Sequence, residues 1–216
     1  MKIHILDKTN SVLNNFIAEL RNIEIQKDAM RFRRNIERVG EILSYEMSKH
    51  LSYSREEVET PLGIKEVLLP HDELVLGSIL RAGLPLHLGV LNYFDRIENA
   101  FISAYRSHKS DGDFDIVVEY LAAPSLENKI LILVDPMLAT GKSLESVYEA
   151  LKSHGVPKEV HLISVIGSKF GVDYIKDKFP ENTNLWIATV DEDLNNRGYI
   201  VPGLGDAGDL AFGIKL

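Results

Sequence analysis

The sequence has 216 residues, of which 45% are hydrophobic and 26% are charged, a composition typical of a globular chain with a substantial core. A formal net charge of −8 disfavours a broad nucleic-acid interface, because such a surface neutralises phosphates with basic side chains. The absence of cysteine excludes disulfides, thiolate metal sites and thiol catalysis. No stretch is apolar enough for a signal peptide or a membrane span, so we expect a cytoplasmic protein without a membrane partner.

No repeat and no linker-like composition divides the chain, so residues 1–216 are expected to form one domain. Its first 50 residues predict two helices, because apolar side chains recur at helical spacing. These side chains are Val12, Leu13, Phe16, Ile17 and Leu20, then Phe32, Ile36, Val39, Leu43 and Met47. The second helix also carries Arg31, Arg33, Arg34 and Arg38. This basic face indicates either a solvated or subunit-facing surface or a site for phosphate or a nucleotide effector.

From about residue 72, short apolar runs alternate with helical stretches. Strands are predicted at 74–80, 100–105, 116–121, 130–134, 160–166 and 185–190, and helices at 84–94 and 143–151. This alternation predicts an α/β fold with a mostly parallel central sheet flanked by helices. The stretch after Asp191 is crowded with glycine and predicts loops instead of a regular element.

The most informative loop follows the apolar run 130–134. That run ends in Asp135, and a small-residue turn leads into the helix predicted from Ser143. Ligands bind at the carboxyl ends of parallel strands, and a helix N-terminus attracts phosphate with its free N–H groups. The loop therefore predicts a phosphate site, with hydroxyl donors from Thr140 and Ser143 and with Asp135 placed to accept hydrogen bonds from sugar hydroxyls.

This loop has two alternative interpretations. The triplet Gly141-Lys142-Ser143 is the end of a Walker A loop, but that motif needs glycine where Pro136 stands. Proline offers no backbone N–H to a phosphate, which argues against a nucleotide kinase. A plain strand-to-helix connection capped by Ser143 remains the structural alternative.

The C-terminal stretch 198–209 is the second informative segment. Gly203, Gly205 and Gly208 have the spacing of a dinucleotide fingerprint, but only eight residues follow Gly208, too few for the required βαβ unit. Glycine-rich backbone can instead approach a small planar base and match its polar groups with peptide groups. The alternative is a tail that merely packs.

Both segments resemble those of one family. Asp135-Pro136-Met137-Leu138-Ala139-Thr140-Gly141 resembles the phosphoribosyl pyrophosphate motif of type I phosphoribosyltransferases, in the form typical of the uracil phosphoribosyltransferases. Residues 198–209 resemble the uracil-binding signature of the same enzymes. The resemblance extends from about Arg31 to the C-terminus and is strongest at 78–84, 134–143 and 198–209. It implies the type I fold with a glycine-rich C-terminal hood.

The resemblance also implies an activity and its residues. A phosphoribosyl group would pass from phosphoribosyl pyrophosphate to uracil, giving UMP and pyrophosphate. Arg106, Asp135 and Asp206 would be catalytic, and the base would contact Ile200, Gly205, Asp206 and Ala207, largely by main chain. Phosphoribosyl pyrophosphate would be bound by Arg81, Arg106, Asp135, Pro136, Met137, Leu138, Ala139, Thr140, Gly141, Lys142, Ser143 and Asp206. Residues 191–216 would form the base-binding tail.

Further expectations concern cofactors and partners. Mg²⁺ would arrive with phosphoribosyl pyrophosphate, without a direct protein ligand. A polar loop at 107–115, after the pair Tyr105-Arg106, would act as a mobile lid. A homodimer or homotetramer is expected, and GTP regulation, known in some relatives, stays open. Lys142 stands where the family usually has glycine. An RNA-binding regulator of the same fold, or the same chemistry on another base, are the competing functions.

Overall fold

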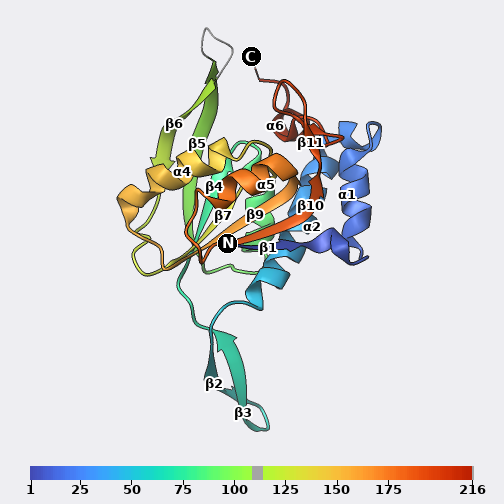
Figure 1. Ribbon diagram of the computed structural model, residues 1–216. Helices are drawn as coiled ribbons and strands as arrows, with labels where there is room; N and C mark the ends of the chain where they lie inside the picture. The colour runs from blue at the N-terminus through green and yellow to red at the C-terminus, as the bar shows by residue number, and fades with distance from the viewer. Residues whose placement is uncertain (109–113, 216) are drawn as a thin grey trace.

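The computed structural model describes the chain except residues 109–113 and 216. Its centre is an eight-stranded sheet in the order β1-β10-β9-β7-β4-β5-β6, with the short β8 beside β9 (Figure 1). The strands are β1 (Lys2–Ile5), β4 (Leu74–Leu80), β5 (Glu98–His108), β6 (Phe114–Ala122), β7 (Ile130–Val134), β8 (Met137–Leu138), β9 (Glu159–Ser168) and β10 (Asn184–Asp191). Every pair is parallel except β5 with β6. The predicted α/β fold with a mostly parallel sheet is confirmed.

Helices cover both faces of the sheet, because residues with opposite parity along each strand point to opposite sides. On one face, Leu76 and Ile132 pack with α1 (Leu13–Arg21), α2 (Ala29–Ser48) and α3 (Gly83–Leu91). On the other face, Val75 and Leu131 pack with α4 (Lys142–Leu151) and α5 (Lys169–Lys176). Short 3-10 turns follow β1, α1 and α4, at Leu6–Lys8, Ile25–Lys27 and Lys152–His154. No helix in the described part of the chain is long and apolar enough to cross a membrane.

All predicted helices and strands are present, with ends shifted by a few residues. The largest shifts concern the segment expected to be a loop at 107–115. There β5 continues to His108 and β6 begins at Phe114, because antiparallel pairing continues to the register His108–Phe114. The loop prediction is therefore wrong for 107–108 and 114–115, and residues 109–113 lie outside the described part.

The tail after Asp191 is more regular than predicted. It contains β11 (Asp193–Leu194), paired with β12 (Ile200–Val201), and the short helix α6 (Ala207–Phe212). The helix forms because the Asp206 side chain caps it by accepting a hydrogen bond from the N–H of Asp209 at 3.0 Å. The expectation of loops alone was wrong for these residues, since a cap can start a helix inside a glycine-rich sequence.

A two-stranded hairpin that was not predicted from the sequence projects from the body (Figure 1). It consists of β2 (Tyr53–Thr60) and β3 (Gly63–Pro70), which pair only with each other. Nearly all of its side chains are exposed or half-buried. The hairpin therefore adds nothing to the core.

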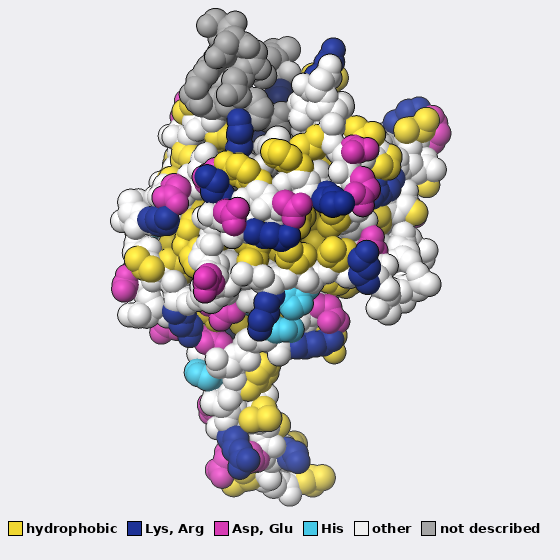
Figure 2. Space-filling model, viewed as in Figure 1, with side chains coloured by type: hydrophobic (Ala, Val, Ile, Leu, Met, Phe, Trp, Pro, Cys, Tyr) yellow, Lys and Arg dark blue, Asp and Glu magenta, His cyan; other side chains and the backbone are white. Residues whose placement is uncertain are grey.

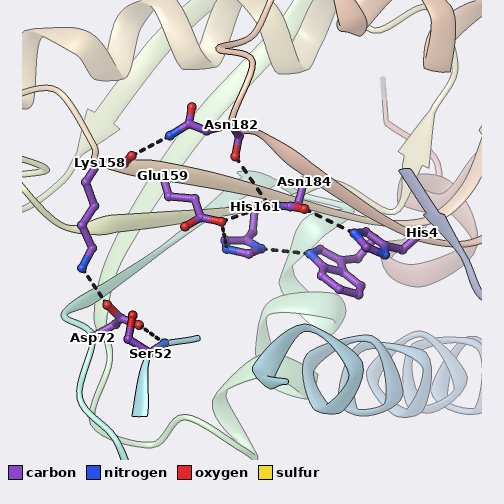
Figure 3. A network of polar contacts seen from close by, with 9 residues as sticks. His4, Ser52, Asp72, Lys158, Glu159, His161, Asn182 and Asn184 are labelled. Carbon is purple, nitrogen blue, oxygen red and sulfur yellow. Dashed lines mark hydrogen bonds and ion pairs between the residues drawn. The ribbon is translucent and has the colours of Figure 1, made fainter. Parts of the chain in front are cut away.

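A polar network at the amino-terminal ends of the strands fixes the base of this hairpin (Figure 3). The nearly buried Asp72 carboxylate accepts hydrogen bonds from the Ser52 N–H and the Lys158 ammonium, each at 2.6 Å. Burial would raise the pKa of Asp72, but these bonds hold it below its usual value. Nearby, the Trp186 indole donates to Nδ1 of His161 at 2.9 Å, and Nε2 of His161 faces Glu159.

Two buried histidines make the fold sensitive to acid. His87 in α3 is 1% exposed and its ring lies against Phe101, and His161 is fully buried. Burial lowers the pKa of each imidazole to about 4. Each ring therefore stays neutral in the folded chain at pH values where the unfolded chain binds a proton.

We predict that stability is complete above the unfolded histidine pKa of 6.5 and falls as the pH approaches 4. Replacing His87 by leucine, which conserves volume, should reduce the loss between pH 7.5 and pH 5 by on the order of 2 kcal/mol. Urea denaturation at both pH values measures this. The matched control is His71→Leu at an exposed site. An unchanged pH dependence in His87→Leu would contradict the assignment.

Candidate active site

Two loops leave neighbouring strands at the carboxyl edge of the sheet. Strand β4 ends before Arg81 and strand β7 ends before Asp135, and the two strands pair in parallel up to Ser78 and Val134. Gly83 seals their contact: a Cβ there would lie 2.7 Å from Oγ of Ser78 and 3.1 Å from the carbonyl oxygen of Val134. The close approach requires glycine and brings the Arg81 loop against the end of β7.

The Asp135 loop is held mainly by its backbone. The N–H of Asp135 donates to Ile163 O, and Pro136 O accepts from the N–H groups of Val165 and Ile166. The Asp135 carboxylate accepts a longer hydrogen bond from the N–H of Met137 at 3.3 Å. The loop encloses a hollow lined by Asp135, Met137, Leu138, Ala139, Thr140, Gly141, Ser143 and Leu144.

Helix α4 begins directly at this hollow. Gly141 caps it with φ +80°, and a Cβ at Gly141 would meet Tyr174 at 2.8 Å. Lys142 is the first helical residue and is half-buried. The first N–H groups of a helix have no intrahelical acceptor and carry a partial positive charge. The hollow therefore lies at a helix end whose N–H groups and partial charge suit an anion.

Two residues that the sequence analysis missed support this loop from α5. The Ser168 hydroxyl donates to Ala139 O at 2.6 Å and accepts from the N–H of Gly171 at 2.9 Å. A Cβ at Gly171 would lie 2.3 Å from the same Ala139 oxygen. Part of the signal was available in the sequence, because a serine shortly after a predicted strand is a candidate N-cap for a following helix.

Arg81 links the second loop to the C-terminal tail. Its guanidinium donates to Oδ1 of Asp209 at 3.3 Å and to Gly213 O at 3.1 Å, and its side chain is 46% exposed. A Cβ at Gly208 would lie 3.9 Å from both Ala82 and the Arg81 guanidinium. The tail therefore lies over the Arg81 loop (Figure 1).

The tail presents backbone to this edge. Ile200 and Ala207 have buried side chains, so their peptide groups are what they can offer a ligand. Gly205 has φ +94°, a conformation that suits glycine. The Asp206 carboxylate is half-buried, caps α6 and lies 3.6 Å from the Lys215 ammonium.

Most of the site residues expected from the sequence therefore gather at one edge. The Asp135 loop adjoins the Arg81 loop, and the tail lies on the Arg81 loop. The backbone of Arg106 lies in β5, the strand beside β4, but its side chain is outside the described part. Among the described residues, no three acidic or histidine side chains lie close enough together to hold a metal ion.

The chain was compared with known families and proteins. The family model described as "Uracil phosphoribosyltransferase" matches residues 8–214. A uracil phosphoribosyltransferase of Porphyromonas gingivalis is 53% identical over 216 residues, covering 100% of both chains. One from Methanothermobacter thermautotrophicus is 40% identical over 188 residues, covering 86% of this chain and 85% of that protein.

Solved structures agree with this result. A protein from Aquifex aeolicus is 30% identical with a TM-score of 0.87, covering 99% of each chain. A hypoxanthine phosphoribosyltransferase from Staphylococcus aureus has a TM-score of 0.52 at 16% identity, covering 86% of this chain and 84% of that chain; at that identity the likeness concerns the fold alone. With a family model over almost its whole length and a full-length relative sharing half its residues, the chain belongs to the uracil phosphoribosyltransferase family.

Proposed function

We propose that this chain transfers a phosphoribosyl group from phosphoribosyl pyrophosphate to uracil, giving UMP and pyrophosphate. One observation carries the proposal: the Arg81 loop joins an anion-binding hollow and a backbone-rich tail at a single edge of the sheet. The two parts suit the two halves of the product, a sugar phosphate and a flat base.

The hollow suits the phosphoribosyl half. The 5′-phosphate would bind the loop 137–143, where the helix N-terminus and the hydroxyls of Thr140 and Ser143 offer donors. Asp135 would accept hydrogen bonds from the ribose hydroxyls. Holding the sugar phosphate orients the anomeric carbon for attack by N1 of the base. As the new bond forms, the bond between that carbon and pyrophosphate breaks and the N1 proton leaves to solvent.

Arg81 suits the leaving group. Its planar fork can donate to two pyrophosphate oxygens at once. The present partners of this half-exposed side chain are Asp209 and Gly213, and pyrophosphate would replace them as the stronger acceptor. Arg106 would add a second cation from β5, and negative charge growing on pyrophosphate would be stabilised by both.

The tail suits uracil. Peptide groups of Ile200, Gly205 and Ala207 would match the two carbonyls and the ring N–H of the base, since the side chains of Ile200 and Ala207 are occupied in the core. Recognition by hydrogen bonds rejects a base whose polar groups leave buried partners unpaired. Strong preference for uracil follows from this arrangement.

Mg²⁺ would enter with phosphoribosyl pyrophosphate. Mg²⁺ prefers phosphate oxygens and water to an all-protein cage, so the substrate would supply most of its ligands. When bound it would supply neutralising charge for the leaving group. Cytoplasmic location belongs to the same proposal, and GTP regulation stays an untested prediction.

The alternative of an RNA-binding regulator has less support. It depended on the basic face of α2, but all four of its arginines have partners within the chain, including Arg38, which donates to Oδ1 of Asn35 at 3.0 Å. Arg31 pairs with Glu19 at 2.7 Å, Arg34 pairs with Glu37 at 2.5 Å, and Arg33 donates to Ala211 O at 2.6 Å. Side chains used in this way offer little free charge to a phosphate backbone.

An assay of phosphoribosyl transfer to uracil, cytosine, hypoxanthine and orotate tests the proposal. With phosphoribosyl pyrophosphate and Mg²⁺ present, we expect UMP formation from uracil and little turnover of the other bases. Preferred turnover of hypoxanthine would overturn the assignment of the base.

Asp206 can be tested apart from its role as a helix cap. Asp206→Asn keeps a side-chain acceptor for the N–H of Asp209 but removes the charge. We expect turnover to fall at least about tenfold in both Asp206→Asn and Asp206→Ala, whereas thermal stability falls only in Asp206→Ala. Normal turnover in Asp206→Asn would assign this residue to structure alone.

Metal dependence gives a second test. Removing Mg²⁺ with EDTA should abolish UMP formation and leave the melting temperature of the substrate-free protein unchanged, because the ion is expected to be held by the substrate and water. A lower melting temperature in EDTA would indicate a metal bound by the protein itself.

The hairpin supports the proposed homo-oligomer. Its apolar side chains Val58, Leu62, Ile64, Leu68 and Leu69 are exposed, Leu62 by 99%, and the space-filling view shows it standing clear of the body (Figure 2). An isolated two-stranded hairpin has little stability in water, so one that carries these exposed apolar side chains, interspersed with charged ones, away from its own core suits contact with a second copy of the chain.

We predict that Ile64→Ser combined with Leu68→Ser shifts the protein from dimer or tetramer towards monomer. Light scattering coupled to size exclusion measures the mass. The matched control, Val12→Ser, removes an exposed apolar side chain beside α1. A monomeric wild-type protein would contradict the proposal.

A further inference from the structure

The last residue of α1 reaches across the molecule to the tail. The Arg21 guanidinium donates to both carboxylate oxygens of Asp191, at 2.7 Å each, and to Gly203 O at 3.0 Å. Asp191 is the last residue of β10, immediately before the tail. One arginine therefore connects the end of a central strand with the glycine-rich segment that follows it.

The same pair also holds the other side of Gly203. The N–H of Gly203 donates to Oδ2 of Asp191 at 2.9 Å, so the peptide groups on both sides of this residue are tied to the Arg21–Asp191 pair. Gly203 has φ +60°, and a Cβ would lie 2.1 Å from Ile200 O. The turn is therefore tight, and its backbone has little freedom to move while these bonds persist.

Gln26 makes a second connection from the N-terminal part. Its side-chain amide donates to Leu20 O at 2.9 Å and to Leu204 O at 3.3 Å. Residue 203 is thus anchored to the end of α1, and residue 204 to the turn between α1 and α2. They directly precede Gly205, where the base-contacting stretch 205–207 begins.

The Arg21–Asp191 ion pair is largely shielded from solvent. The Asp191 side chain is 9% exposed and that of Arg21 24%. Burial would raise the pKa of Asp191, but hydrogen bonds from Arg21 and Gly203 hold it below its usual value. A bidentate, partly desolvated pair fixes orientation as well as charge, unlike a solvated surface pair.

We infer that Arg21 and Gln26 are positioning residues of the uracil site, which act on the base through Asp191, Gly203 and Leu204. This inference rests on the proposed function. The phosphoribosyl hollow has a different support, since Ser168 and Gly171 hold its loop from α5. Loss of Arg21 should therefore weaken recognition of uracil and leave recognition of phosphoribosyl pyrophosphate nearly unchanged.

The test is steady-state kinetics of Arg21→Ala with each substrate varied in turn. We expect the KM for uracil to rise about ten- to hundredfold, the effect of losing a charged hydrogen bond, and the KM for phosphoribosyl pyrophosphate to stay within about twofold. Arg21→Lys should lie between wild type and Arg21→Ala, because lysine keeps the charge but lacks the planar fork.

The matched control is Arg31→Ala. Arg31 also forms a bidentate ion pair, with Glu19, and joins α1 to α2, but this pair contacts no residue in the described part of the tail. It should leave both KM values within about twofold of wild type. If Arg21→Ala and Arg31→Ala change both KM values alike, the role of Arg21 is structural and the inference is wrong.

Gln26→Ala keeps the test decisive if Arg21→Ala fails to fold. It removes two uncharged hydrogen bonds, to Leu20 O and to Leu204 O, so a folded protein is expected, with a KM for uracil raised about three- to tenfold. An unchanged KM for uracil in this variant would overturn the inference. A wild-type chain that does not use uracil would instead overturn the proposed function, so the two failures are distinguishable.

Discussion

Parallel pairing between β4 and β7 is the constraint on which the site depends. It brings the carboxyl ends of two strands to one edge, and Gly83 lets the loop that follows β4 lie against the last carbonyl of β7. The Arg81 loop then has a fixed place beside the Asp135 loop. A larger residue at position 83 would separate them, since its Cβ would overlap Ser78.

The residues at the amino-terminal ends of the strands have a structural role. There Asp72, Lys158 and Ser52 fix the base of the hairpin, and the Trp186–His161 contact closes the ends of β9 and β10 (Figure 3). The candidate site and this supporting polar network therefore lie at opposite ends of the strands. Ligand sites of parallel α/β sheets generally lie at the carboxyl ends.

The tail depends on distant parts of the chain for its shape. Arg81 holds it from one side through Asp209, and Arg21 holds it from the other through Asp191 and Gly203. Glycine lets this backbone adopt positive φ at Gly203 and Gly205 but also raises the entropy lost on ordering it. The partly buried ion pair between Arg21 and Asp191 offsets part of that loss.

The sequence by itself determined the alternating α/β pattern, the phosphate loop at 135–143 and the glycine-rich stretch at 198–209, because periodicity, strand ends and glycine spacing are local signals. It left the helix within the tail, the projecting hairpin, Ser168 and Arg21 without a structure or a role. Only the tertiary structure decided these, since each depends on partners far along the chain: 182 positions separate Arg21 from Gly203. Hydrogen bonds between residues so far apart produce no local pattern in the sequence. Their partners are therefore known only once the chain has folded.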